Sequence, residues 1–162
     1  MKRVLIISDT HYPKKTIDPI FFDLVEEADI IIHCGDLEEF ELLEELENFN
    51  KPVYAVRGNN YDYLLQNRLN DKMIISIEDI IIGITHGNGL SGSPLINARH
   101  SFKKDEVDII CYGHSHVLEI TRENNIQYIN PGSFTSSRKG ENSYIILLVE
   151  GNDFTINKNY IK

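Results

Sequence analysis

The chain has 162 residues, of which 41% are hydrophobic and 25% are charged, and its formal net charge is −9. This length supports one buried core, so we expect a single domain over residues 1–162. The acidic balance argues against an extended nucleic-acid surface, because such a surface needs many basic side chains that release counterions. The sequence contains neither an apolar run of membrane-spanning length nor a signal peptide, which predicts a cytoplasmic protein that makes no membrane contact.

The first half of the chain alternates strands and helices. Apolar runs predict three strands, over residues 3–8, 29–34 and 53–56. Asp18 as N-cap and Pro19 at the first helical position predict a helix between the first two strands. Residues 38–47 predict an acidic amphipathic helix with a solvated face. This β-α-β-α-β order is typical of parallel strands joined by helical crossovers.

The second half of the chain is richer in strands. Residues 73–77 and 80–84 predict an antiparallel hairpin, and a proline near its start favours a helix over residues 93–104. Further short strands are expected over residues 108–112, 118–122, 126–129, 144–150 and 154–157. So many strands for so few helices favour two sheets packed face to face, with helices outside.

Residues that bind metals follow most of these strand-like runs. Asp9 and His11 stand two apart, so their side chains can face the same way on an extended chain. His114 and His116 repeat this spacing, and two imidazoles on one face seldom have a purely structural purpose. The motifs are Asp9-Thr10-His11, Gly35-Asp36, Gly58-Asn59, His86-Gly87 and Gly113-His114-Ser115-His116. Because strand ends of α/β sheets converge in space, the motifs predict one metal site.

Each motif also has an ordinary structural explanation. Asp36 and Glu39 could form the capping box of the following helix, and Asn59 could occupy a turn with a left-handed backbone. His86 could be a loop histidine. Caps and turns do not explain why four of the six histidines follow strand-like runs beside Asp, Asn or Gly. The conjunction of the motifs therefore favours a site.

The order and spacing of these five motifs resemble the calcineurin-like metallophosphoesterase superfamily. Asn130-Pro131-Gly132-Ser133 is similar to its small single-domain phosphodiesterase branch, which also contains the retromer scaffold subunit. The resemblance implies the α/β fold class, as a four-layer α-β-β-α sandwich in which two mixed β-sheets are flanked by helices, without a cap domain. It also implies two divalent metal ions, with Mn²⁺ preferred and Ni²⁺, Zn²⁺ or Fe²⁺ as alternatives.

The resemblance assigns a role to each motif residue. It implies a first ion held by Asp9, His11 and His116, and a second held by Asn59, His86 and His114, with Asp36 bridging the two. Two divalent cations carry more positive charge than the carboxylates of Asp9 and Asp36 neutralise. The remaining positive charge attracts an anionic substrate.

The function implied is hydrolysis of small or nucleotide-like phosphoesters, with a preference for diesters. A metal-bridging hydroxide would attack phosphorus, and Asp36, Asn59 and His86 would take part through the metals. A phosphomonoesterase of the same fold and a non-catalytic protein-interaction scaffold are the alternatives. The branch also allows a homo-oligomer.

One region departs from the superfamily pattern. A histidine that can protonate the leaving oxygen often follows the Gly-Asn pair, whereas this chain has Asn60, and the following Asp is displaced to Asp62. The proton donor therefore has no assigned residue. His33, Asn60, Asp62 and Arg138 are candidates for orienting a ligand or contacting a phosphate, although His33 could equally be a core histidine and Arg138 a surface cation. Tyr61 could stack on a base or pack as an ordinary aromatic.

Overall fold

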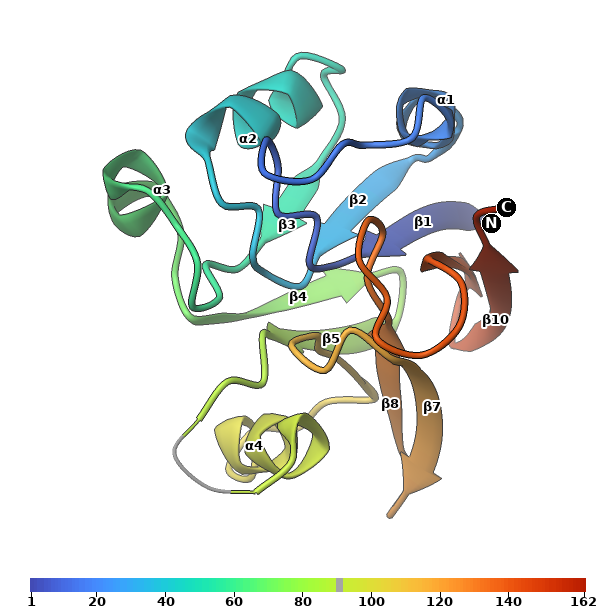
Figure 1. The fold of residues 1–162 in the computed structure, drawn as a ribbon. Coiled ribbons are helices and arrows are strands. Elements are labelled where there is room, and N and C mark those ends of the chain that lie inside the picture. Colours follow the sequence, from blue (N-terminus) through green and yellow to red (C-terminus); the bar gives the residue numbers. More distant parts are fainter. Residues whose placement is uncertain (90–91) are drawn as a thin grey trace.

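The computed structural model describes residues 1–89 and 92–162 and contains two mixed sheets of five strands each (Figure 1). The strand order is β10-β9-β1-β2-β3 in the first sheet and β4-β5-β6-β8-β7 in the second. Helices α1 and α2 cover the outer face of the first sheet, and α4 covers the outer face of the second (Figure 1). The predicted α-β-β-α sandwich is thereby confirmed.

The first sheet contains the predicted parallel unit. Its elements and crossovers are β1 (Lys2–Ile7), α1 (Ile20–Glu27), β2 (Ile30–His33), α2 (Phe40–Glu47), β3 (Val53–Ala55), β9 (Ser143–Glu150) and β10 (Asp153–Tyr160). Strands β1, β2 and β3 are parallel, whereas β9 and β10 are antiparallel to their neighbours. Val4 and Ile6 of β1 face the second sheet, and Leu5 and Ile7 face the helices. A strand buried on both faces is apolar throughout, which explains the clear sequence signal.

The second sheet is built around the predicted hairpin. Its elements are β4 (Lys72–Ile77), β5 (Ile80–Thr85), α4 (Pro94–Ser101), β6 (Ile109–Cys111), β7 (Leu118–Glu123) and β8 (Ile126–Pro131). Strands β4 and β5 pair antiparallel, and Glu78 in the turn between them has a φ of 53°. Strands β5, β6 and β8 are parallel, and β7 returns antiparallel to β8.

Several boundaries differ from the sequence-based prediction by a few residues, including those of the helices. Helix α1 begins at Ile20, one residue late, because the Asp18 carboxylate accepts a hydrogen bond from the Ile20 amide at 3.0 Å. Helix α2 begins at Phe40 with Glu39 at its N-cap, so Asp36 caps no helix there. Helix α4 ends at Ser101, before the predicted residue 104.

A short helix, α3 (Tyr63–Arg68), was not predicted, and Asp62 is its N-cap. One Asp62 oxygen accepts from the Leu65 amide at 2.8 Å, and the other accepts from the Phe40 amide at 2.9 Å. Asp62 therefore joins the starts of α2 and α3, and both its carboxylate oxygens are occupied by backbone donors.

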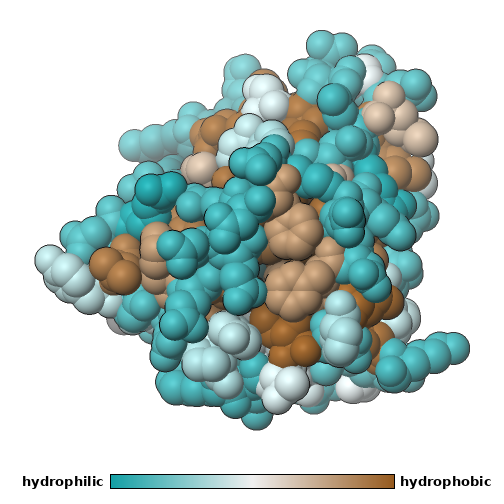
Figure 2. All heavy atoms as spheres, turned by 90° about the horizontal axis from the view of Figure 1, so that it is seen from above, coloured by the Kyte–Doolittle hydropathy of each residue, from teal (hydrophilic) through white to brown (hydrophobic). Residues whose placement is uncertain are grey.

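The helix-covered face of the first sheet is largely hydrophilic and contains a small apolar patch (Figure 2). Ile20 and Phe22 of α1 are both 39% exposed, and the Phe22 ring stacks on Phe49 with centroids 6.4 Å apart. None of the helices in the described part of the chain has the length and apolar content needed to cross a bilayer.

The two hydrogen bonds of Asp62 predict its effect on stability. We expect Asp62→Ala to lower the free energy of unfolding by about 1–2 kcal/mol, because two helix-start amides lose their acceptor. Urea unfolding measures the change. Asp153→Ala, at an exposed position of β10, is the control and should stay within about 0.5 kcal/mol of wild type. Equal midpoints for the two variants would contradict the capping role.

Candidate metal centre

The seven motif residues lie together at the carboxyl ends of five strands. Asp9 and His11 follow β1, and Asp36 follows β2. The other four follow β3, β5 and β6: Asn59, His86, His114 and His116. Parallel strands of each sheet end on the same side, so residues up to 107 positions apart in the chain meet at one edge of the sandwich.

The first group of ligand atoms comes from Asp9, His11 and His116, which lie within 4.8 Å of one another. The Nε2 atoms of His11 and His116 face each other at 3.1 Å. Asp9 Oδ1 is 3.9 Å from the first of these nitrogens and 3.3 Å from the second. One carboxylate and two imidazoles therefore point at a common position.

The second group comes from Asp36, His86 and His114, whose ligand atoms also lie within 4.8 Å of one another. His114 Nδ1 is 3.2 Å from His86 Nε2 and 3.1 Å from Asn59 Oδ1. The Asn59 amide oxygen therefore joins this group as a fourth donor.

The Asp36 carboxylate lies between the two groups. Its Oδ2 atom is 3.7 Å from His11 Nε2, in the first group, and 3.3 Å from His86 Nε2, in the second. The capping-box alternative for Asp36 is thus wrong, because its oxygens face histidines and the following loop rather than the start of α2.

The donor set fits divalent metal ions. Within the described part of the chain, Asp9 Oδ1 is buried and has no hydrogen-bond partner. A buried carboxylate oxygen without a partner is costly, and so are two imidazole nitrogens that face each other across 3.1 Å. A cation at the first group would satisfy both. Imidazole nitrogens with carboxylate and amide oxygens suit first-row divalent metals.

Hydrogen bonds to Nδ1 orient three of the histidine rings. His11 Nδ1 donates to Glu38 Oε2 at 3.1 Å, and His86 Nδ1 donates to the Cys34 carbonyl at 2.7 Å. His116 Nδ1 donates to the Ser136 carbonyl at 2.8 Å. With the proton on Nδ1, each ring turns the lone pair of Nε2 toward the ligand groups.

Both carboxylates are held in the ionised form. Burial raises the pKa of Asp9, but the nearby His116 and His86 side chains favour the carboxylate form more strongly, so the pKa lies below its ordinary value. Burial likewise raises the pKa of Asp36, and its contacts with His86 and Asn60 lower it further than burial raises it. Both groups are therefore anionic at neutral pH.

The backbone at this edge adopts conformations that most side chains avoid. Five of the seven residues have positive φ: Asp9 (53°), His11 (45°), Asp36 (59°), His114 (71°) and His116 (59°). Such strain persists only where surrounding contacts over-determine it. Gly35 and Gly58 also have positive φ, and a Cβ at Gly58 would collide with the Asp36 carboxylate. The glycines of the Gly-Asp and Gly-Asn motifs are thus steric requirements of the site.

Of the other candidate residues, Asn60 is closest to the predicted metals. Its backbone amide donates to Asp36 Oδ1 at 2.9 Å, and its side-chain amide donates to Asp36 Oδ2 at 2.8 Å. Arg138 is exposed, and its backbone amide donates to the His116 carbonyl at 3.1 Å, which places it at the rim. Asp62 is occupied by helix starts and faces away from this cluster.

His33 is fully buried in a neutral form. Its Nδ1 accepts from the Gly35 amide at 3.2 Å, so Nε2 carries the proton and donates to Thr10 Oγ1 at 3.0 Å. The ring thus links the loop after β1 to the loop after β2, without contacting a ligand itself.

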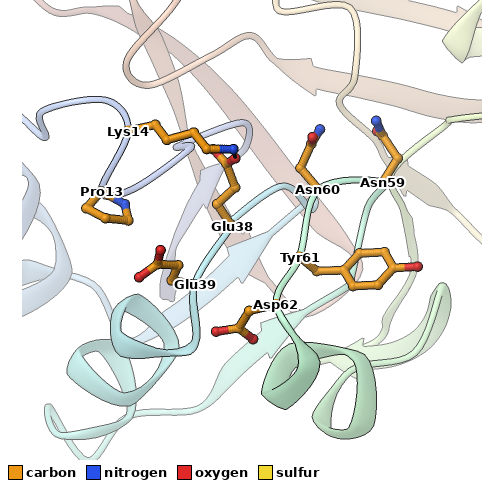
Figure 3. A pocket seen from close by; sticks show the side chains of 8 residues that line it. All are labelled: Pro13, Lys14, Glu38, Glu39, Asn59, Asn60, Tyr61 and Asp62. Atoms are coloured by element: carbon orange, nitrogen blue, oxygen red, sulfur yellow. Dashed lines mark hydrogen bonds and ion pairs between the residues drawn. The ribbon is translucent and has the colours of Figure 1, made fainter.

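Glu38 was missed by the sequence analysis, which assigned it to the solvated face of the acidic helix. It is only 7% exposed and precedes α2, where it accepts from His11 Nδ1 and pairs with Lys14 (Figure 3). The apolar repeat of α2 begins at Phe40, which is the one signal that could have separated Glu38 from the helix.

Comparison with known proteins assigns the chain to a family. The calcineurin-like phosphoesterase superfamily domain matches residues 1–152. A probable metallophosphoesterase of Methanocaldococcus jannaschii is 37% identical over 148 residues, which cover 90% of this chain and 74% of that protein. A phosphodiesterase of the same organism is 31% identical over 145 residues, covering 80% of this chain and 82% of that protein.

A solved structure shows the same architecture. Wild-type Vps29 from Entamoeba histolytica, complexed with Zn²⁺, superposes with a TM-score of 0.77 at 25% identity and covers 96% of this chain and 91% of that one. The chain therefore belongs to the calcineurin-like phosphoesterase superfamily, a class of metallophosphoesterase hydrolases.

The position of Glu38 predicts a role in metal binding. We expect Glu38→Gln to raise the dissociation constant for Mn²⁺ about tenfold, because an amide holds the His11 ring less firmly than a carboxylate does. Calorimetric titration of the metal-free protein measures this change. The exposed neighbour is the control, and Glu39→Gln should bind Mn²⁺ as wild type does. Equal affinities for both variants would count against the role of Glu38.

His33 predicts a pH dependence of stability. Burial lowers its pKa from 6.5 to about 3, so below pH 6.5 the unfolded chain binds a proton that the folded chain does not. The free energy of unfolding then falls as the pH drops from 6.5 toward 3, by up to about 1.4 kcal/mol per unit. We expect metal-free wild type to lose stability more steeply than His33→Gln in urea unfolding over this window. Parallel profiles would contradict this prediction.

Proposed function

We propose that this chain is a metal-dependent phosphodiesterase that hydrolyses small or nucleotide-like phosphoesters with two divalent ions, one at each ligand group. The observation that carries the proposal is the position of Asp36 Oδ2, within 3.7 Å of a histidine nitrogen from each group. A single carboxylate between two sets of ligands is the arrangement expected of a two-metal site.

The chain's own residues would arrange the charges for phosphoester hydrolysis. Asp9 and Asp36 are ionised and bring two negative charges, fewer than two divalent ions would bring in positive charge. The surplus attracts a phosphodiester anion despite the net charge of −9 on the chain. When bound, the ions would polarise the phosphate and lower the pKa of water toward neutrality.

The loop after β3 would supply no proton donor for the leaving group. Asn60 occupies the position after the Gly-Asn motif, and both its backbone and side-chain amides donate to Asp36. An amide cannot protonate a leaving oxygen, so Asn60 would orient the bridging carboxylate instead. Arg138, at the rim, would contact the phosphate as a cation.

The choice of metal follows from the donor atoms. Mn²⁺ suits a set of imidazole, carboxylate and amide donors, and Ni²⁺, Zn²⁺ and Fe²⁺ are alternatives. The complex of the similar Vps29 with Zn²⁺ supports Zn²⁺ among these.

A non-catalytic scaffold is the second candidate. The similarity to Vps29 favours it, and so do the exposed apolar side chains of Ile20 and Phe22 on α1. Against it stands the complete ligand set, including the buried Asp9 oxygen without a partner, which a scaffold does not need. A phosphomonoesterase would use the same site and differs only in substrate charge.

Metal reconstitution tests the proposal. The protein is stripped with chelator, reloaded with Mn²⁺, Ni²⁺ or Zn²⁺ singly, and assayed on matched mono- and diesters. We expect metal-dependent hydrolysis with the diester preferred, and we expect Asp36→Asn to lower kcat/KM about a hundredfold or more, because the metals lose their shared anion. Asp153→Asn is the control and should keep wild-type activity. No turnover with any metal would favour the scaffold.

A further inference from the structure

Two cavities flank the ligand groups and share two lining residues, Asn59 and Tyr61. The first, of about 300 Å³, is lined by Pro13, Lys14, Glu38, Glu39, Asn59, Asn60, Tyr61 and Asp62 (Figure 3). The second, of about 430 Å³, is lined by Arg57, Gly58, Asn59, Tyr61, Asp71, Lys72, Thr85, Asn88 and Ser101. Since Asn59 is a predicted ligand, either cavity adjoins the place where a phosphate would bind.

Charge distinguishes the two cavities. The first contains three carboxylates and a single amine, and that amine, Lys14, is already paired with Glu38. The second contains two cations, Arg57 and Lys72, and one carboxylate, Asp71. An anionic ester is repelled by the excess of carboxylates in the first cavity, whereas the lining of the second has no such excess, so the second would receive the organic part of the substrate.

The second cavity offers an aromatic surface that is held in place. The Tyr61 ring is 40% exposed and extends on the Asn59 side of the loop, away from Lys14 and Glu38 (Figure 3). The Arg57 guanidinium lies 5.2 Å from the ring centroid. Two hydrogen bonds to Asp71 Oδ1, at 3.0 and 2.6 Å, and one to the Gln66 carbonyl fix that guanidinium in turn.

Tyr61 is also fixed relative to the predicted metals. It stands two residues after Asn59, so their Cα atoms are at most about 7 Å apart. The backbone amides of Asn59 and Asn60 are bonded to Asp36, and Tyr61 forms a β-bridge with Glu38. A ring stacked on Tyr61 would thus lie at a set distance from a phosphate at the ligand groups.

The remaining lining suits a polar ring system. Both cations have acidic partners, Asp71 for Arg57 and Asp105 for Lys72, so little net charge is left for a second phosphate. Thr85, Asn88 and Ser101 contribute neutral hydrogen-bonding groups. A nucleoside has both the flat ring and the neutral polar groups that this lining matches.

We infer that the second cavity binds the nucleoside part of a nucleotide-type diester, with Tyr61 as the stacking platform. The inference rests on the proposed function for its phosphate position, but it concerns the recognition of the organic group. It makes Tyr61 a specificity-determining residue.

Binding measurements test the inference without requiring turnover. The Mn²⁺-loaded protein is titrated with thymidine 5′-monophosphate and with methyl phosphate, which carry the same phosphate group. We expect wild type to bind the nucleotide about tenfold more tightly, as one stacked base predicts. Tyr61→Leu should lose most of that advantage and leave methyl phosphate unaffected, and Tyr61→Phe, which keeps the ring, should retain it.

A matched control lies on the same loop and helix start. Tyr63 is 76% exposed and lines neither cavity, so Tyr63→Leu should behave as wild type with both ligands. Equal wild-type affinities for the two ligands, no binding of either ligand, or an equal effect of Tyr61→Leu on both would overturn the inference.

A metal-free measurement separates this inference from the proposed function. Thymidine alone is added to the metal-free protein, and backbone amide shifts are followed by NMR. We expect shifts at Tyr61, Thr85 and Asn88, and none at Lys14 or Glu39, which line the first cavity. Such shifts in a protein without metal-dependent hydrolysis would leave the cavity assignment standing while the proposed function fails. Metal-dependent hydrolysis with shifts confined to the first cavity would support the proposed function and contradict the cavity assignment.

Discussion

The Asp36 carboxylate joins several parts of the molecule: two loops of the first sheet and a histidine of the second sheet. Its Oδ1 atom accepts the backbone amides of Asn59 and Asn60, which fixes the loop after β3 to the loop after β2. Its Oδ2 atom faces His11 on one side and His86 on the other, so it also connects the two sheets. Gly58 has no side chain because the space is filled by this carboxylate. Without Asp36, the two ligand groups would lose the carboxylate between them and the loop after β3 would lose its acceptor.

The packed core stabilises the unfavourable backbone conformations of the site. Apolar layers lie between the sheets and on both outer faces, with Ile6 and Ile32 fully buried in the middle one. Rigid strands can then end in loops whose residues adopt positive φ, such as Asp9 at 53° and His114 at 71°. Those conformations are unfavourable in isolation, and the packed strands and the hydrogen bonds at their ends hold them in place.

A shared fold does not decide between a hydrolase and a scaffold, because activity depends on the site. Here the buried ligands and the fixed histidine rings favour chemistry, and the more cationic cavity beside Asn59 favours an anionic substrate with a ring. Ile20 and Phe22 are exposed on α1, which covers the outer face of the first sheet (Figure 1).

The sequence by itself determined the sandwich, the order of its strands along the chain and the seven residues that meet at its edge. Strands buried on both faces require continuous apolar runs, and metal ligands require particular side chains at strand ends, so both leave local signals. Only the tertiary structure decided the roles of Glu38, Asn60, Asp62 and Tyr61. From the sequence, Glu38 is one of several acidic residues in a predicted helix, whereas in the structure it precedes α2. Asp62 is a candidate site residue from the sequence, whereas in the structure it caps α3. Their contacts lie in other segments, such as His11 for Glu38 and Phe40 for Asp62, and these segments come together only when β1, β2 and β3 pair in the first sheet.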